Sequence, residues 1–268
     1  MYYTQRRATA PNTTGVTWIH GCNIGMAESS DGGATWKYRG LADIDYGKDQ
    51  HPKDYTYWAP EAIWVTGTYH MFLTFVPGIF NDWNHPREIV HLTSQDGVKW
   101  DPVGPIDLKS GRVIDPCVMQ LPSGKWRMWY KDEEKESPLS YADSSDLQHW
   151  EPKGSAVTEF KGEGPKVFHW KDRYWLIADC WQNGMRVWSS MDCTNWKMQN
   201  EVLFGHHGDV VVSGGRAWWF YFAGPGQPAH SRTTPINVAE LSVVDGKLLA
   251  TADAPAYIDL KSVREEEK

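Results

Sequence analysis

Short apolar or alternating runs make up most of the chain, and almost no segment carries the 3.6-residue period of an amphipathic helix. Two examples are Val210–Val212 and Trp218–Phe222. Turn-forming residues separate the runs, since the sequence contains 24 Gly and 16 Pro. Runs of about four to eight residues between turn signals are typical of β-strands. The pattern therefore predicts an all-β protein.

One motif recurs along the chain: Ser, any residue, Asp, any three residues and Trp. It occupies residues 94–100, 144–150 and 190–196, and it occurs with one extra residue at 29–36. Asp turns a chain by accepting hydrogen bonds from nearby backbone amides, and the Trp can then fill the space between neighbouring sheets. Because the motif repeats, we interpret these aspartates as scaffold residues rather than catalysts.

A second repeat consists of an apolar run, a tight turn and another apolar run, which is the pattern of a β-hairpin. With the strand before each Ser-Asp turn and the strand after it, every hairpin completes a four-stranded sheet. Units of about 45 to 65 residues of this kind predict a five-bladed β-propeller forming a single domain over residues 1–268. The predicted blades are 1–45, 55–110, 112–155, 160–201 and 205–250.

The first strand of each propeller blade lines the central channel, so the leading residues of these strands should converge. Counting back eleven residues from the first residue after each hairpin turn gives Trp58, Asp115, Glu163 and His206. A requirement shared by all blades would have repeated the residue type, yet these four differ. Two carboxylates across a pocket are the groups that glycoside hydrolysis uses. We predict that Asp115 and Glu163 form such a pair; the structural alternative is two solvent-facing strand ends.

Composition and charge restrict the partners. The 16 Trp, 12 Tyr and 8 Phe suit a protein that stacks on sugars, whereas the net charge of -7 argues against binding nucleic acid or an acidic membrane. No apolar run approaches the roughly 18 residues of a membrane span, and no signal-peptide core follows the N-terminal charges. The four cysteines lack metal-type spacing, so we expect buried free thiols.

The segments 58–61, 114–116 and 163–165 read Trp-Ala-Pro-Glu, Ile-Asp-Pro and Glu-Gly-Pro. They resemble motifs of glycoside hydrolase family 43, a family of five-bladed propeller arabinanases, arabinofuranosidases and xylosidases. The resemblance spans about residues 1–250. It implies that Glu163 is the general acid and that Asp115 orients it and raises its pKa.

The same resemblance implies hydrolysis of an arabinofuranoside or xyloside linkage with inversion of configuration and with no required cofactor. Arabinanase members hold a hydrated calcium or other ion near a central histidine. The candidates for that position here are His206 and His207, and we name His207 as the metal residue.

The chain departs from the family pattern in its first blade. Met71–Thr74 matches Met1–Thr4, so the position equivalent to Trp58 would precede Met1. The first blade is therefore predicted to lack its innermost strand, which in the family carries the base aspartate. Three explanations remain open: an N-terminal truncation, a carbohydrate-binding propeller without catalysis, or water activation by another acid. The candidate acids are Asp54, Glu61 and Asp209.

Further residues are predicted to contact the sugar, because carboxylates bond sugar hydroxyls while aromatic rings stack on sugar C–H faces. Asp54 lies in an acidic, aromatic loop before a channel strand, and His20 lies in a loop near the mouth of the first blade. For Asp54 the structural alternative is a packed loop, and for His20 it is a hydrogen-bonding group whose bonds are satisfied within the protein. The full substrate-binding set is Trp58, Glu61, Asp54, His20, His206 and Asp209.

A sialidase-like hydrolase is a further alternative. The turn at 29–36 resembles the Asp box of sialidases, but the eleven arginines show no placement at the channel strands, where a sialidase binds its substrate carboxylate. A sialidase-like hydrolase therefore ranks third.

We expect an extracellular or periplasmic protein if the N-terminus is truncated and a cytoplasmic one otherwise. A second copy of the chain is a candidate to cover the open edge of the first blade, forming a homodimer.

Overall fold

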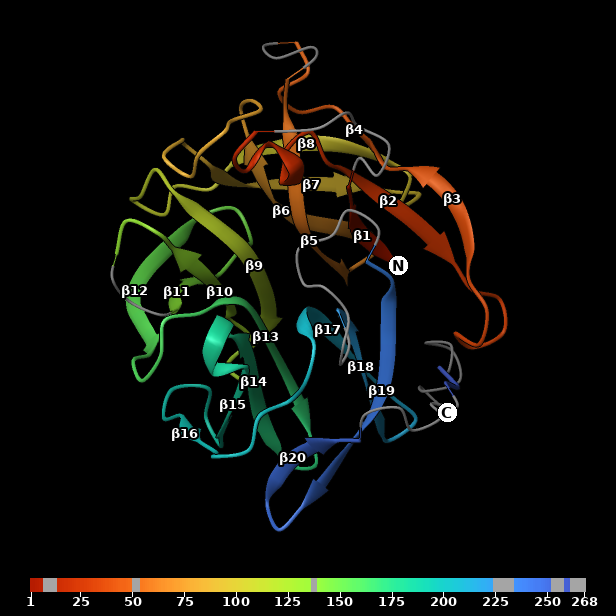
Figure 1. Ribbon diagram of the computed structural model, residues 1–268, viewed down its shortest axis with the longest axis vertical. Coiled ribbons are helices and arrows are strands. Elements are labelled where there is room, and N and C mark those ends of the chain that lie inside the picture. Colours follow the sequence, from red (N-terminus) through yellow and green to blue (C-terminus); the bar gives the residue numbers. More distant parts are fainter. Residues whose placement is uncertain (7–13, 50–53, 136–138, 224–233, 252–257, 261–268) are drawn as a thin grey trace. The chain divides into compact units, whose positions relative to one another are not determined.

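The secondary structure is dominated by strands. The computed structural model describes residues 1–6, 14–49, 54–135, 139–223, 234–251 and 258–260 (Figure 1). Within these ranges the helical segments are two 3-10 turns, η1 (Thr17–Ile19) and η2 (Trp181–Asn183). No helix among the described residues is long and apolar enough to cross a membrane. The prediction of an all-β protein is confirmed.

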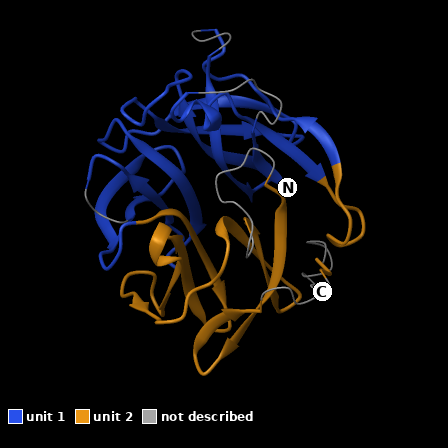
Figure 2. Ribbon diagram, viewed as in Figure 1, with its two compact units in different colours: residues 1–27, 38–161 blue, residues 28–37, 162–268 orange. Residues whose placement is uncertain are grey.

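Contacts divide the chain into two compact units (Figure 2). Unit 1 comprises residues 1–27 and 38–161, and unit 2 comprises residues 28–37 and 162–268. Each unit is described by itself below. The single domain over residues 1–268 stays a prediction.

Unit 1 contains the first three sheets almost completely. The first sheet has three strands, β1 (Tyr2–Gln5), β2 (Asn23–Glu28) and β3 (Lys37–Leu41). The second consists of β5 (Thr56–Val65), β6 (Thr68–Val76), β7 (Glu88–Ser94) and β8 (Lys99–Pro105), with the short β4 (Asp43–Ile44) parallel to β8. The third consists of β9 (Val113–Gln120), β10 (Trp126–Asp132), β11 (Leu139–Ser144) and β12 (Trp150–Val157).

Unit 2 contains the last two sheets, both of four strands. One consists of β13 (Glu163–Trp170), β14 (Arg173–Asp179), β15 (Met185–Ser190) and β16 (Lys197–Met198). The other consists of β17 (His206–Ser213), β18 (Arg216–Phe222), β19 (Ile236–Val244) and β20 (Lys247–Ala250). Five such sheets, built from consecutive strands, make the fold a five-bladed β-propeller. Among the described residues the first sheet has three strands, whereas the other sheets have four or, with β4, five, so the first blade is one strand short of the four-stranded unit, as predicted.

The apolar core lies between neighbouring sheets because strand side chains alternate between two faces. On β6, Met71 and Phe75 pack into a cluster with the fully buried Trp100, whereas the intervening Phe72 packs into a second cluster with Trp150. In unit 2, both sheets contribute to one cluster, which includes Trp175, Trp219 and Leu241. All four cysteines are buried and free, as predicted.

The repeated Ser-Asp turns have the scaffold role that the sequence predicts. In the turn after β7, Asp96 Oδ1 accepts hydrogen bonds from the backbone amides of Val98 and Lys99 at 2.8 and 2.9 Å. In the first turn, hydrogen bonds from Thr35 lower the pKa of Asp31 to about 2. These aspartates therefore hold turns and are not available as proton donors.

The tryptophans of the four turns differ in burial. Trp100 and Trp150 fill spaces between sheets, whereas Trp196 is partly exposed and Trp36 is 37% exposed. The prediction is wrong for Trp36. Its Nε1 donates to the Gly33 carbonyl of its own turn at 2.9 Å, but the buried Trp150 makes the equivalent bond to the Leu147 carbonyl at 3.0 Å, so this local contact does not explain the exposure.

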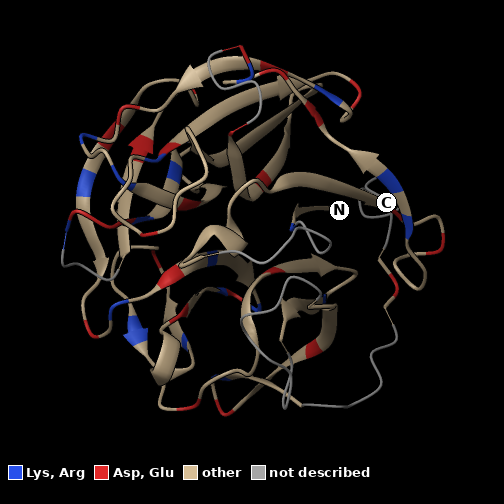
Figure 3. Cartoon of the chain, turned by 45° about the horizontal axis from the view of Figure 1, so that its top comes forward, with Lys and Arg blue, Asp and Glu red and all other residues tan. Residues whose placement is uncertain are grey.

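Charged side chains of both signs are interspersed along strands and loops (Figure 3). Several form pairs, such as Arg216 with Glu240 at 2.7 Å and the more buried Arg127 with Asp143 at 2.6 Å. Exposed pairs contribute little to stability.

A buried histidine in β7 should make the stability of the protein depend on pH. His91 is 3% exposed, stacks on Phe72 at 4.5 Å between centroids, and its Nε2 lies 2.9 Å from Nδ1 of His70. Burial, followed by the charge of His70, lowers the pKa of His91 to about 4. The folded state therefore binds a proton at lower pH than the unfolded state, whose value is near 6.5.

We expect the free energy of unfolding to fall by up to about 3 kcal/mol between about pH 6.5 and pH 4. Urea unfolding at pH 7 and at pH 4.5 measures this loss. His91→Phe should remove most of it, while His169→Gln, which changes an exposed histidine, should retain it. An equal loss in wild type and His91→Phe would assign the acid sensitivity to other groups.

Candidate active site

Each four-stranded blade carries a β-bulge near the start of its first strand. In β13, Glu163 pairs with Asp179 and Lys166 pairs with Ile177, so two residues lie opposite one. The same irregularity occurs in β5 and β9, and a one-residue shift occurs in β17. A bulge bends its strand and redirects a side chain, and bulges are common beside active sites. The first bulge residue has a positive φ in every case: Ala59, Asp115, Gly164 and His207.

The strand ladders correct one part of the register predicted from the sequence. Asp115 is equivalent to Ala59 and Gly164, and not to Trp58 and Glu163. The count of eleven residues is wrong by one in this blade. Five residues separate the paired Gln120 and Trp126, whereas four separate the equivalent pair, Trp64 and Tyr69. The predicted site residues therefore come from two adjacent positions, the paired residue before the bulge and the first bulge residue.

Asp115 is held in a strained backbone conformation in unit 1. Its φ is 57° and its residue is 6% exposed. Its amide donates a hydrogen bond to Oγ1 of Thr74 on β6 at 3.0 Å. A non-glycine residue in the left-handed region costs free energy, and such strain concentrates at functional sites. The geometry of Asp115 fits a positioned carboxylate better than a solvent-facing strand end.

Trp58 and His20 contact each other in unit 1. Trp58 is 7% exposed, and its Nε1 donates to the Ile19 carbonyl at 2.9 Å. His20 is fully buried with its ring 5.1 Å from that of Trp58. Its Nε2 lies 3.0 Å from Nε2 of His85, whose pKa is lowered mainly by burial. His20 therefore packs against Trp58. Its contact with substrate stays a prediction.

The two remaining acids of unit 1 differ in environment. Glu61 on β5 is 8% exposed, and its Oε1 accepts a hydrogen bond from the Val118 amide at 3.3 Å, which links β5 to β9. Asp54 is exposed and lies just before β5. If Glu61 activated a water molecule, its carboxylate would have to bind that water in addition to the Val118 amide. Asp54, by contrast, is exposed to solvent.

Glu163 and His207 form the central contact of unit 2. Oε1 of Glu163 lies 2.9 Å from Nε2 of His207, and both side chains are about one quarter exposed, 24% and 27%. The imidazole lies over the bulge of β13, since a Cβ at Gly164 would be 2.6 Å from its Nδ1. Gly164 also has a positive φ of 55°. Glycine is therefore required at this position for the carboxylate and imidazole to approach.

Two further pairs surround this contact. Nδ1 of His206 lies 2.9 Å from Oδ2 of Asp179, which is 2% exposed. Nζ of Lys166 lies 2.6 Å from Oδ1 of Asp209, whose side chain is 54% exposed. Sequence reasoning missed Asp179. Its register in the β13–β14 hairpin, directly opposite Glu163, is the signal that would have identified it.

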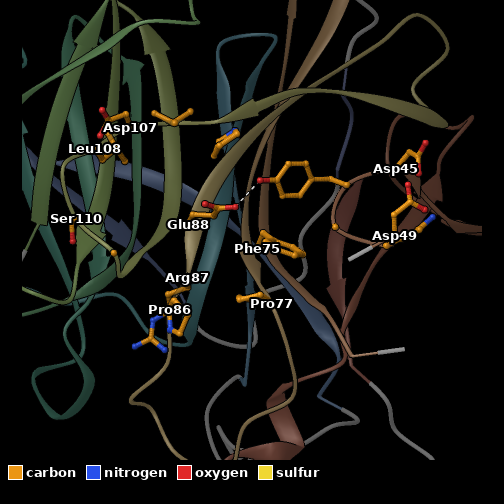
Figure 4. Close-up of a pocket in the computed structure, with 16 residues that line it drawn as sticks. Asp45, Asp49, Phe75, Pro77, Pro86, Arg87, Glu88, Asp107, Leu108 and Ser110 are labelled. Carbon is orange, nitrogen blue, oxygen red and sulfur yellow. Dashed lines mark hydrogen bonds between the residues drawn. The ribbon is translucent and has the colours of Figure 1, made fainter. Parts of the chain in front are cut away.

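Unit 1 also contains a cavity of about 610 Å³ that the sequence did not predict (Figure 4). Its lining includes Asp45, Asp49, Asp107 and Glu88, and Oε1 of Glu88 accepts a hydrogen bond from the Tyr46 hydroxyl at 2.6 Å. None of the predicted site residues lines it. Acidic side chains alone do not define a binding site, so we assign it no catalytic role.

The site residues described above lie on a five-bladed propeller, and comparison with known proteins agrees on the fold. No family model matches the sequence, and no curated protein matches it either. Solved structures of glycoside hydrolases do match.

One is the β-xylosidase RS223, at 14% identity and a TM-score of 0.72 over 92% of this chain and 90% of that one. Another is a family 43 β-xylosidase/α-arabinofuranosidase from a compost microbial metagenome, at 16% identity and 0.69 over 93% and 89%. A third is a family 43 β-1,3-galactosidase, at 14% identity and 0.72 over 93% and 89%. These likenesses show the five-bladed fold that family 43 glycoside hydrolases have.

Proposed function

We propose that the protein is a glycoside hydrolase in which Glu163 is the general acid. The observation that carries the proposal is the contact of the Glu163 carboxylate with His207 at 2.9 Å, at a partly exposed position beside the bulge of β13. The carboxylate can thus reach a substrate while protein groups fix its orientation. The fold shared with family 43 structures supports the same reading.

In the proposed reaction, Glu163 donates a proton to the leaving oxygen of the glycosidic bond. This role requires a protonated carboxyl at the working pH. The Asp115 carboxylate would favour that form by like-charge repulsion if it faces Glu163, and this facing arrangement stays a prediction. Water then attacks from the opposite face of the sugar with the help of a second carboxylate, which gives inversion.

We infer an arabinofuranoside or xyloside as the substrate class. The family motifs carry this inference, and one structure with the same fold was determined in complex with xylotriose. Trp58 would contribute its indole edge to the sugar site, since most of its surface is buried. The base remains a choice among Asp54, Glu61 and Asp209, and Nζ of Lys166 lies 2.6 Å from Oδ1 of Asp209.

The metal role predicted for His207 stays a prediction. Hard cations such as Ca²⁺ prefer oxygen ligands, and in unit 2 the Glu163 carboxylate and His207 would be among the groups that hold an ion. The proposed mechanism uses the Glu163 carboxylate as the acid, and no step of it is routed through an ion. The same fold has been solved in a form described as calcium-free.

A carbohydrate-binding propeller without turnover is the second candidate function. The three-stranded first sheet favours it, because no innermost strand carrying an acid is found there among the described residues. The scaffold, the aromatic residues and the carboxylates would then bind a sugar without cleaving it.

The proposed function is tested with 4-nitrophenyl glycosides of α-L-arabinofuranose, β-D-xylose and β-D-galactose, followed by proton NMR of the first product. We expect hydrolysis of the arabinoside or the xyloside and a product with inverted anomeric configuration. Oligosaccharide binding by calorimetry with no turnover would establish the binding propeller instead. A product of retained configuration would overturn the inverting mechanism and leave a hydrolase.

A further inference from the structure

Trp181 is an exposed aromatic residue in unit 2, two residues after Asp179, which pairs with the proposed acid Glu163. It opens the 3-10 turn η2, directly after β14, and its exposed fraction is 45%. Single exposed apolar side chains are common on protein surfaces and need no function. Trp181 differs from these ordinary surface residues in its backbone conformation.

Trp181 has a φ of 51°, in the left-handed region. A bulky side chain rarely adopts this conformation, and the strain persists only where surrounding contacts impose it. Here the Trp181 amide donates to Oδ1 of Asp179 at 2.9 Å. The amide of Gly184 donates to the Trp181 carbonyl at 3.0 Å, and the amide of Asn183 donates to the Cys180 carbonyl at 3.0 Å. Four residues of one short turn therefore hold an indole at the surface in a strained conformation.

The same contacts connect Trp181 to Glu163. Asp179 pairs with Glu163 across the β13–β14 ladder, and its second oxygen contacts His206 at 2.9 Å. A Cβ at Gly162, the residue before Glu163, would lie 2.9 Å from Sγ of Cys180 and 3.0 Å from the Asp179 carbonyl. The turn that carries Trp181 thus packs directly on the backbone that carries the acid.

We propose that Trp181 is the stacking surface for the sugar ring on the leaving-group side of the bond that Glu163 protonates. This inference rests on the proposed function. The acid contacts the leaving oxygen, so the ring attached to that oxygen lies beside it. Glu163 is 24% exposed and Asp179 is buried, whereas Trp181 is the more exposed neighbour. An indole there offers a flat apolar face to the C–H face of a pyranose or furanose ring.

The test compares substrates with and without a leaving-group sugar. Trp181→Ala should raise KM for a xylo- or arabino-oligosaccharide about tenfold, or about 1.4 kcal/mol, with little change in kcat. It should leave kcat/KM for the matching glycosyl fluoride unchanged, because fluoride has no ring to stack. Trp64→Ala is the matched control: Trp64 is 54% exposed but lies in unit 1 at the far end of β5.

A second variant guards against misfolding. Trp181→Asn removes the indole, and Asn tolerates the left-handed backbone better than Ala. Both variants should therefore raise KM for the oligosaccharide and leave kcat/KM for the glycosyl fluoride unchanged. Trp181→Tyr should restore most of the oligosaccharide affinity. Equal loss on fluoride and oligosaccharide would place the indole against the other sugar and overturn the assignment, as would an unchanged KM.

Binding measurements separate this inference from the proposed function. Calorimetry with an oligosaccharide should show about tenfold weaker binding for Trp181→Ala than for the wild type, whether or not the wild type turns the sugar over. If the protein hydrolyses glycosides and Trp181→Ala binds as well as the wild type, the inference fails and the function stands. If no glycoside is hydrolysed yet the affinity falls, the function fails and the stacking surface stands.

Discussion

Glu163→Gln is expected to lower kcat/KM by about 10²- to 10⁴-fold on glycosides with poor leaving groups. Gln keeps the size of the side chain and can still hydrogen-bond to His207, but it has no proton to donate. The loss should shrink for 2,4-dinitrophenyl glycosides and glycosyl fluorides, whose leaving groups depart without protonation. Steady-state kinetics on such a leaving-group series measures the effect.

The control for this variant is Glu201→Gln, which removes a partly exposed carboxylate of the same unit, paired with Lys247. It should keep wild-type kinetics. Thermal unfolding should show both variants folded. A loss below about tenfold on every substrate would exclude Glu163 as the general acid, because one factor of ten is only about 1.4 kcal/mol of barrier.

The fold could be predicted from the sequence because its signals are local and repeated. A Ser-Asp turn needs only a side-chain oxygen and backbone amides within a few residues, as at Asp96. A hairpin needs only two apolar runs and a short turn. When such units recur at a nearly constant interval, the number of blades follows from counting, and the three-stranded first sheet follows from the missing copy.

The site was predicted less well because its geometry depends on single-residue offsets. One extra residue in the β9–β10 turn moves Asp115 from the paired position into the bulge, and residue counting cannot detect the insertion without the ladder. The Pro that follows Ala59, Asp115 and Gly164 marks the bulge and is the alignment that would have corrected the count. Proline lacks the amide that a regular ladder position would need.

Other features depend on contacts that a single sequence does not encode locally. His20 is buried against Trp58, whereas the sequence predicts only that its loop lies near the mouth of the first blade. Asp179 and Trp181 carry no motif. The structure draws attention to them through the pairing of Asp179 with Glu163 and the positive φ of Trp181. Cross-strand pairing, rather than composition, therefore identifies Asp179 here, and a positive φ alone does not mark a site residue because the turn residues Leu147 and Cys193 share it.

Asp115→Asn is the second change with a large expected effect. We expect kcat/KM to fall by about 100-fold and the basic limb of its pH profile to move to lower pH. The sign follows from charge: in the proposed site, in which Asp115 faces Glu163, the Asp115 carboxylate would disfavour the ionised acid, so its removal would lower the pKa of Glu163 and the proton would be lost at lower pH. Asn tolerates the left-handed backbone of this position, where φ is 57°, so the fold should be retained.

The matched control is Asp101→Asn, which removes an exposed carboxylate on β8 of the same unit. It changes the net charge equally and should leave the basic limb in place. The pH dependence of kcat/KM for an aryl xyloside or arabinoside measures both. If Asp115→Asn lowers activity without moving the limb, Asp115 binds substrate and does not act on Glu163. If neither activity nor the limb changes, the two carboxylates do not share a site, and the strained backbone of Asp115 serves only the bulge of β9.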